Sequence, residues 1–256
     1  MEHSLIYEFP LNEKIRTLLR LEQQFICFRD CLARSQAYDA YSAITILVEI
    51  YKLLEYSAAD KVLLEEQLKY HRSLERLTQT PSIDVVALNN VLAKIKSSTE
   101  ALKNFNFSQV AFMQHELFKS YTNRMPLPGG TMCFDTPLLH YWLQQSTSQH
   151  QEYCESWIAE FQPVENGLLL LLHLLRQCHY PKSVVSKYGQ FKQPLKQPHD
   201  VQLIKIEYDN ALAVYPQFSG DKHRVNIQFF DGCLEQRTHK TTHQDIPFEL
   251  TLCSLS

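Results

Sequence analysis

The sequence predicts an α+β protein in which helices come first and an antiparallel β domain comes last. Apolar residues recur at spacings of three and four through most of the chain, as amphipathic helices require. From Val201 onward the period changes to two, which is typical of half-buried strands. The segment between the two patterns, from Pro181 to Asp200, contains several prolines and lysines. We therefore expect a helical domain over residues 12–181 and a β domain over residues 182–256, with residues 1–11 contributing a strand.

The N-terminal elements follow from local signals. Leu5–Phe9 is a short β-prone run closed by Pro10, which suits a strand at a sheet edge. Asn12 is a good N-cap for the helix that follows. The apolar seam of that helix needs a partner helix and comprises Leu18, Leu21, Phe25, Phe28 and Leu32.

Four further helices are expected before the middle of the chain. They run from about Asp39 to Tyr56, from a capping box at Ser57–Asp60 to Leu77, from Ser82 or Asp84 to Leu102, and from a cap at Ser108 to Tyr121. Short connections favour a bundle or a set of long hairpins. The apolar seams fit either an internal core or a homodimer face, and the sequence does not separate the two.

The strongest break is Met125–Gly130. A short strand is expected at Thr131–Phe134, and Pro137 then suits the first position of a helix. Two more helices follow, the second from Val164 to Cys178. The four strands expected after them are Val201–Tyr208, Ala211–Tyr215, Arg224–Phe230 and Pro247–Cys253, and the polar loop from Asp231 to Asp245 is expected to be mobile.

The composition is that of a soluble globular protein. Of 256 residues, 45% are hydrophobic and 21% charged, and the net charge of −3 gives no general attraction to nucleic acid or to anionic membranes. The seven cysteines show no paired spacing, and the chain opens at Met1 without an apolar signal segment. We therefore expect a cytoplasmic protein with reduced thiols.

Local signals for catalysis or metal binding are weak. Cys233, His239 and His243 have part of a zinc-like spacing, but this segment does not supply the usual set of four ligands. Glycine loops for phosphates, nucleophile elbows and zinc-protease motifs are not found. We expect no metal, no cofactor and no enzymatic activity, and we keep a metal-assisted hydrolase as a minor alternative.

A basic turn in the last third is the best candidate for partner binding. Lys222 and Arg224 are two residues apart at the start of an alternating strand, so both side chains leave on one side. They fit either a solvated strand face or a site for an acidic partner. A second hypothesis is single-stranded nucleic-acid binding, in which the lysines between Pro181 and His199 act with Tyr188 and Phe191 as stacking surfaces.

Short segments along nearly the whole chain resemble the ZapD family of cell division proteins, in the same order. The segments are Phe9–Lys14 with Arg16, Thr17, Leu19, Arg20 and Glu22; Pro128–Gly130; Phe134–Asp135; Leu139–His140; Trp142–Leu143; Trp157–Ile158; Tyr215–Gln217 with Ser219, Gly220, Lys222 and Arg224; and Phe248–Leu250.

The resemblance implies a cytoplasmic homodimer at the mid-cell division ring. Such a dimer would bind the C-terminal tail of the tubulin-like protein FtsZ, which carries acidic and apolar residues. It would thereby bundle FtsZ filaments and stabilise the Z-ring during septation. Residues matched by position to the basic pocket of the family are Arg20, Lys222 and Arg224, with Arg16, Arg124 and His140 as weaker candidates. Tyr56 and Gln228 stand where relatives carry basic residues, so this pocket is either less positive or complemented by Lys205 or the lysines after Pro181.

Overall fold

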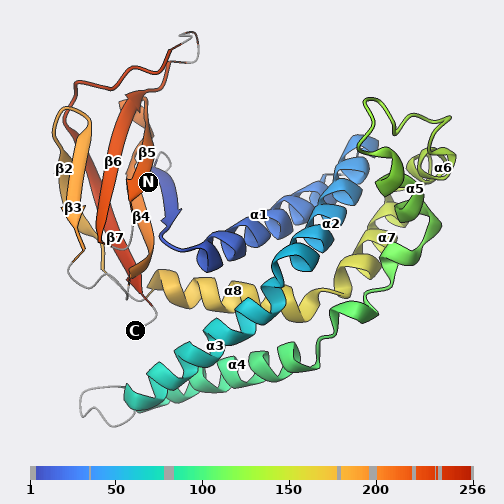
Figure 1. Ribbon diagram of the computed structural model, residues 1–256, viewed down its shortest axis with the longest axis horizontal. Helices are drawn as coiled ribbons and strands as arrows, with labels where there is room; N and C mark the ends of the chain where they lie inside the picture. The colour runs from blue at the N-terminus through green and yellow to red at the C-terminus, as the bar shows by residue number, and fades with distance from the viewer. Residues whose placement is uncertain are drawn as a thin grey trace. The chain divides into compact units, whose positions relative to one another are not determined.

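The computed structural model describes residues 4–34, 36–77, 84–177, 180–195, 201–220, 223–233, 235 and 238–254. The chain divides into two compact units. The β unit comprises Met1–Arg16 and Leu172–Ser256, and the helical unit comprises Thr17–Leu171. The described residues form eight α-helices and seven strands in two antiparallel sheets, which confirms the predicted α+β class (Figure 1).

The bounds of the elements are as follows. The helices are α1 (Glu13–Ala33), α2 (Ala37–Ser57), α3 (Ala59–Leu77), α4 (Val85–Asn104), α5 (Glu116–Arg124), α6 (Pro137–Leu143), α7 (Thr147–Ala159) and α8 (Gln162–Gln177). The strands are β1 (Ser4–Pro10), β2 (Lys182–Ser186), β3 (Gln190–Pro194), β4 (Val201–Asp209), β5 (Val214–Gly220), β6 (Arg224–Asp231) and β7 (Ile246–Ser254).

The first helices start and stop close to the expected positions. The Asn12 side chain accepts a hydrogen bond from the backbone N–H of Ile15 at 2.8 Å, which confirms the predicted cap of α1. The predicted capping box at Ser57 is wrong. The Ser57 hydroxyl instead donates to the Leu53 carbonyl, and Ala58 ends α2 in the left-handed conformation at a φ of 48°.

The helix predicted from Ser108 is also wrong, because this segment forms two short 3-10 helices, Phe107–Gln109 and Phe112–Gln114, before α5 begins. The Glu160 carboxylate accepts hydrogen bonds from the backbone N–H groups of Ala111 and Phe112. Those donors are satisfied from outside the segment, so a continuous helix is not needed to satisfy them. The side chain of His115 caps α5.

The strand predicted at Thr131–Phe134 is a series of turns. The backbone N–H groups of Asp135 and Thr136 both donate to the Met132 carbonyl at 2.9 Å. These hydrogen bonds between near neighbours are those of turns and not of a strand pair. Pro137 then occupies the first turn of α6, as predicted from its missing N–H.

The β unit is a sandwich of two sheets with strand orders β1-β4-β7-β2 and β3-β6-β5. The predicted alternation along β6 is confirmed, because Val225, Ile227 and Phe229 are buried between the sheets. They pack against residues of the larger sheet, among them Ile206 and Phe248. β1 pairs only with β4 among the described strands and forms an edge of the larger sheet, as its sequence indicated.

The prediction of four C-terminal strands was incomplete. β2 and β3 lie in the segment with prolines and lysines before Val201, where no strand was predicted. They join through a tight turn in which Tyr188 and Gly189 have φ values of 50° and 69°. Two successive positive φ values suit a short hairpin turn. The strand expected from Ala211 begins only at Val214, since Asn210–Leu212 is a 3-10 turn capped by Asp209.

Candidate functional site: the outer face of the smaller sheet

The face of the β3-β6-β5 sheet that points away from the sandwich core is called here the outer face. Strand register arranges its side chains in four cross-strand rows. The rows are Pro194 and Arg224; Lys192, Asn226 and Ser219; Gln190, Gln228 and Gln217; and Phe230 and Tyr215. One end of this face is therefore basic, the middle carries amides, and the other end is aromatic.

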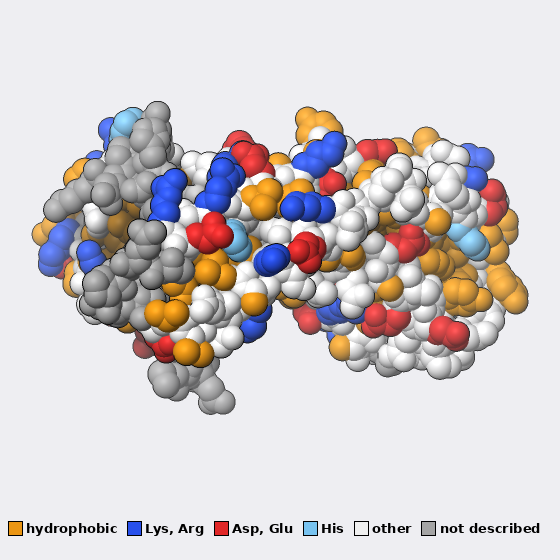
Figure 2. Space-filling model, turned by 90° about the horizontal axis from the view of Figure 1, so that it is seen from below, with side chains coloured by type: hydrophobic (Ala, Val, Ile, Leu, Met, Phe, Trp, Pro, Cys, Tyr) orange, Lys and Arg blue, Asp and Glu red, His pale blue; other side chains and the backbone are white. Residues whose placement is uncertain are grey.

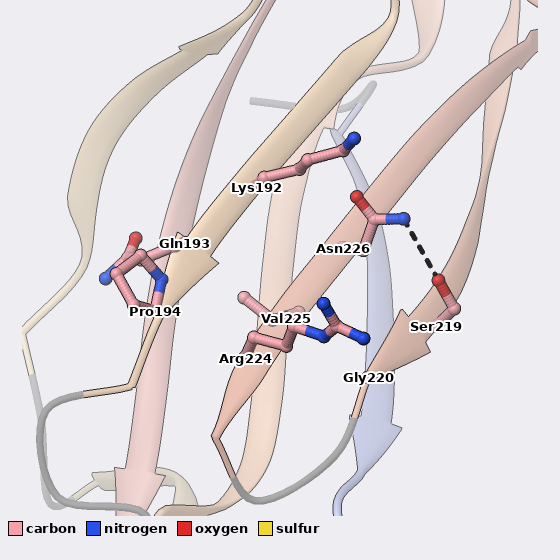
Figure 3. A pocket seen from close by; sticks show the side chains of 8 residues that line it. All are labelled: Lys192, Gln193, Pro194, Ser219, Gly220, Arg224, Val225 and Asn226. Carbon is pink, nitrogen blue, oxygen red and sulfur yellow. Dashed lines mark hydrogen bonds between the residues drawn. The ribbon is translucent and has the colours of Figure 1, made fainter.

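A cavity of about 590 Å³ opens at the basic end. Figure 3 shows Lys192 from β3 and Arg224 from β6 on the two sides of this cavity, with Ser219 and Gly220 entering from β5. The Asn226 side chain lies between the two cations and donates from Nδ2 to the Ser219 hydroxyl at 3.2 Å. The strands thus bring together side chains that are more than 30 positions apart in the sequence.

Both cations of the cavity are exposed, and no carboxylate is among the described residues that line it. A lining of this kind favours an anionic ligand, because ammonium and guanidinium groups form charge-assisted hydrogen bonds with carboxylates. Lys205 does not belong to this group. It lies on β4 in the other sheet, where its Nζ is 3.8 Å from Glu207. Of the two complements suggested by the sequence, Lys192, a lysine after Pro181, lines this cavity, and Lys205 does not.

Tyr208 fixes the strand that supplies Ser219. Its hydroxyl donates to the Val214 carbonyl at the start of β5 at 2.8 Å, and its ring lies edge-on to Phe229. Burial, with a smaller contribution from Tyr7, raises the pKa of Tyr208 above the ordinary tyrosine value. The hydroxyl consequently remains a neutral donor throughout the physiological pH range.

The other predicted site residues fall in different places. Arg224 lines the cavity, whereas Lys222 lies outside the described residues. Arg16 belongs to the β unit, where its Nε is 3.1 Å from Glu13 and its guanidinium lies 5.8 Å from the centre of the Phe9 ring. These contacts give Arg16 a local structural role beside β1.

Arg20, Arg124 and His140 belong to the helical unit. Arg20 is exposed on α1, and Arg124 lies 3.9 Å from Asp135. His140 lines a separate cavity of about 400 Å³ together with Tyr38. The five predicted residues that the structure describes are therefore distributed over both units.

The sequence analysis included Lys192 only as one of the lysines between Pro181 and His199 and did not place it at the basic turn. The alternation Gln190, Phe191, Lys192 was a usable signal, because a partly buried aromatic ring that packs on the core places its neighbours on the opposite face. Gly189 was a second signal in the sequence, because glycine between two short runs is typical of a turn. The prolines on either side argued against a strand in the sequence, although proline is tolerated at the last position of an edge strand.

The stacking surface suggested for nucleic acid is only partly present. Phe191 packs against Phe248 with ring centroids 5.2 Å apart, so its ring belongs to the sandwich core. Tyr188 is 72% exposed at the turn between β2 and β3. A single exposed ring replaces the expected pair.

No helix in the described part of the chain is long and apolar enough to cross a membrane. Within the same residues, no group of three or more His, Cys, Asp or Glu side chains could hold a metal ion. On the face drawn in Figure 2, acidic and basic side chains are interspersed, and no single sign of charge covers it. An acidic partner would therefore have to be recognised by a local patch.

Comparison with known proteins gives one consistent family. The family model ZapD, described as a cell division protein, matches residues 19–228. Proteins named Cell division protein ZapD are similar over nearly their whole length. The one from Methylococcus capsulatus is 32% identical over 100% of both chains, and the one from Nitrosomonas eutropha is 30% identical over 98% of this chain and 100% of its own. A third, from Chromobacterium violaceum, is 30% identical over 96% of this chain and 98% of its own. The chain therefore belongs to the ZapD family of cell division proteins.

Proposed function

We propose that this protein is a non-enzymatic cell division factor that binds the C-terminal tail of FtsZ, which carries acidic and apolar residues, at the basic end of the outer face. As a homodimer in the cytoplasm, it would crosslink and bundle FtsZ filaments at the mid-cell ring. The observation that carries the proposal is the cavity between Lys192 and Arg224, whose described lining holds two cations and no carboxylate. Membership of the ZapD family supports the coarser role in cell division.

The expected strength of one contact is modest. A charge-assisted hydrogen bond contributes about 1.5–3 kcal/mol, and exposed ion pairs contribute about 1 kcal/mol or less. Lys192 and Arg224 are both exposed, so a single tail would bind weakly. A dimer presents two cavities and a filament presents many tails, so effective concentration can raise the avidity by roughly 100-fold or more. Bundling thus requires both the cavity and self-association.

The remaining basic candidates extend the proposal. Lys222, two residues before Arg224 in the sequence, would act as a further cation for the tail. Arg20, Arg124 and His140 would contribute from the helical unit, and Arg16 would act mainly through its packing on Phe9. Each of these roles can be tested by charge removal.

The direct test is charge reversal at the cavity. Arg224→Glu should abolish binding of a labelled FtsZ tail peptide in fluorescence anisotropy and leave the circular dichroism spectrum unchanged. Lys61→Glu is the matched control, because it makes the same charge change at an exposed position on α3. Tail binding by Arg224→Glu at the wild-type affinity would remove the basis for the proposal.

Bundling is tested separately from tail binding. Low-speed sedimentation of FtsZ polymers should increase when the protein is added, and should not increase with FtsZ that lacks its tail. Sedimentation velocity should give a particle of twice the mass of one 30.0 kDa chain. A strictly monomeric particle that still bundles filaments would contradict the crosslinking mechanism.

A further inference from the structure

Lys192 differs from two other lysines of the β unit in what surrounds its ammonium group. Lys187 lies 2.6 Å from Asp245, and Lys205 lies 3.8 Å from Glu207. Lys192 is exposed, and within the described part of the chain no carboxylate forms an ion pair with it. A carboxylate partner stabilises the protonated form of an amine, whereas only the neutral form is a nucleophile. No described residue holds Lys192 in this unreactive form.

The neighbour of Lys192 in the cavity is a cation that suits anions. Strand register places Lys192 opposite Asn226, and Arg224 lies two residues away along β6. Side chains in this diagonal relation start about 7–8 Å apart, a distance that long side chains can span. Figure 3 shows both side chains at the border of the same cavity. A small ligand bound at Arg224 consequently lies within reach of the Lys192 amine.

The cavity carries donors that suit a phosphate group. The guanidinium of Arg224 has paired N–H donors that match two oxygens of a phosphate. The Ser219 hydroxyl accepts a hydrogen bond from Asn226 Nδ2 at 3.2 Å, so its own O–H remains available as a donor. No carboxylate among the described lining residues repels an anion. The volume of about 590 Å³ lies in the usual range of small-molecule sites.

We propose that Lys192 is an acylation site whose donor is a small acyl phosphate such as acetyl phosphate. Arg224 and Ser219 bind the phosphate group, and this places the acyl carbon, one oxygen atom away, beside the Lys192 amine. Arg224 is thus a positioning residue for the modification. The class of donor follows from an anion-binding group and a nucleophilic amine that border one cavity.

The reaction is a simple acyl transfer. The nitrogen lone pair of the neutral Lys192 amine attacks the carbonyl carbon, and a C–N bond forms. The bond between this carbon and the bridging oxygen breaks, and its electron pair leaves with inorganic phosphate. The nitrogen releases one proton to solvent. The products are an N-acetyl-lysine amide and phosphate, and neither an oxidant nor a reductant takes part.

Acylation of Lys192 would regulate the proposed tail-binding site, and this consequence rests on the proposed function. Acetylation removes the positive charge of a lysine, so the described lining would fall from two cations to one. The loss of one exposed ion pair should weaken the binding of a single FtsZ tail by roughly threefold to fivefold. A dimer uses two sites, so its avidity for a filament should fall by roughly tenfold or more.

The modification is tested on the full chain without FtsZ. The protein is incubated with acetyl phosphate at pH 8, and the acetylated fraction of each lysine is followed by peptide mass spectrometry. Lys192 should react about tenfold faster than Lys61, an exposed lysine on α3. Inorganic phosphate should slow the reaction at Lys192 and leave the rate at Lys61 unchanged, because it competes for Arg224. Equal rates at the two lysines would overturn the proposal.

A substitution separates positioning by Arg224 from general lysine reactivity. Arg224 is exposed, so Arg224→Gln leaves the core intact and should lower the rate at Lys192 to that at Lys61. Arg72→Gln is the matched control, because it makes the same change at an exposed position on α3, and it should leave the rate at Lys192 unchanged. An undiminished rate in folded Arg224→Gln would overturn the role of Arg224. A preference for Lys192 with acetyl coenzyme A but not with acetyl phosphate would overturn the assignment of the donor.

The effect on tail binding is measured separately, so that the two proposals can fail independently. Lys192→Gln imitates the neutral amide of acetyl-lysine and should weaken binding of a labelled FtsZ tail peptide by roughly threefold to fivefold. If Arg224→Glu abolishes tail binding while Lys192→Gln binds at the wild-type affinity, regulation by acylation is wrong and the proposed function stands. If Arg224→Glu binds the tail normally, the proposed function fails, and the acetylation rates alone decide whether Lys192 is a modification site.

Discussion

One arginine at the junction of α1, α7 and α8 donates hydrogen bonds to two carboxylates of very different exposure. Arg29 donates from Nε and Nη2 to the two oxygens of Glu165 at 3.2 and 2.8 Å, and from Nη1 to Glu155 at 2.9 Å. The Glu165 side chain is only 10% exposed, whereas that of Glu155 is 56% exposed. The hydrogen bond to Glu165 is the main cause that raises the pKa of Arg29 above its ordinary value.

We predict that Arg29→Leu lowers the unfolding free energy of the helical unit by about 2–3 kcal/mol. Two charge-assisted bonds to Glu165 would contribute about 3–6 kcal/mol in a shielded site. The Arg29 side chain is 42% exposed, so solvent screening reduces that figure by roughly half. Glu155→Gln should cost less than about 1 kcal/mol, since this partner lies at the surface. Glu165→Gln should cost about 2 kcal/mol, because it weakens the shielded pair.

Urea denaturation followed by tryptophan fluorescence measures this effect for one unit alone. The chain has two tryptophans, Trp142 on α6 and Trp157 on α7, and both lie in the helical unit. With an m-value of about 2 kcal/mol per molar urea, the midpoint for Arg29→Leu should fall by about 1–1.5 M. A loss below about 0.5 kcal/mol for Arg29→Leu, or equal losses for Glu155→Gln and Glu165→Gln, would refute the argument from burial.

Three further predictions concern single groups. Tyr208→Phe removes the donor to the Val214 carbonyl and should destabilise the β unit by about 1–2 kcal/mol, measured by thermal unfolding in near-ultraviolet circular dichroism. Lys187 is the main cause that lowers the pKa of Asp245, so the stability from this pair is present at neutral pH and is lost as the pH falls through the lowered value. Lys187→Met should move the Asp245 titration upward in an NMR experiment, and an unmoved titration would contradict the pairing. Burial raises the pKa of the Cys154 thiol to about 12, so alkylation at pH 8 should be slow in the native protein and fast in urea.

Local chemistry was enough to predict much of this fold. The carboxamide of Asn12 and the ring of Pro137 mark helix starts because each satisfies or removes a backbone donor within one turn. The alternation along β6 predicted which residues enter the core, and it placed Arg224 on the surface. These features depend on neighbours a few positions away, so a linear sequence carries them directly.

One error has a different cause, which is an interaction with a distant part of the chain. Glu160 binds backbone groups of Ala111 and Phe112, almost 50 positions earlier, and thereby replaces the predicted helix from Ser108 with shorter turns. Nothing within that segment indicates that a carboxylate will arrive. Local helix signals therefore overestimated the regularity of the chain.

The candidate site likewise depends on contacts between residues that are distant in the sequence. The sequence by itself determined that Lys222 and Arg224 form a basic turn before an alternating strand, and that the chain resembles the ZapD family. Only the tertiary structure placed Lys192 opposite Asn226, two residues along β6 from Arg224, and put Tyr215 and Phe230 at the far end of the same face. Strand register is the physical reason, because hydrogen bonds between strands make neighbours of residues that no sequence spacing connects.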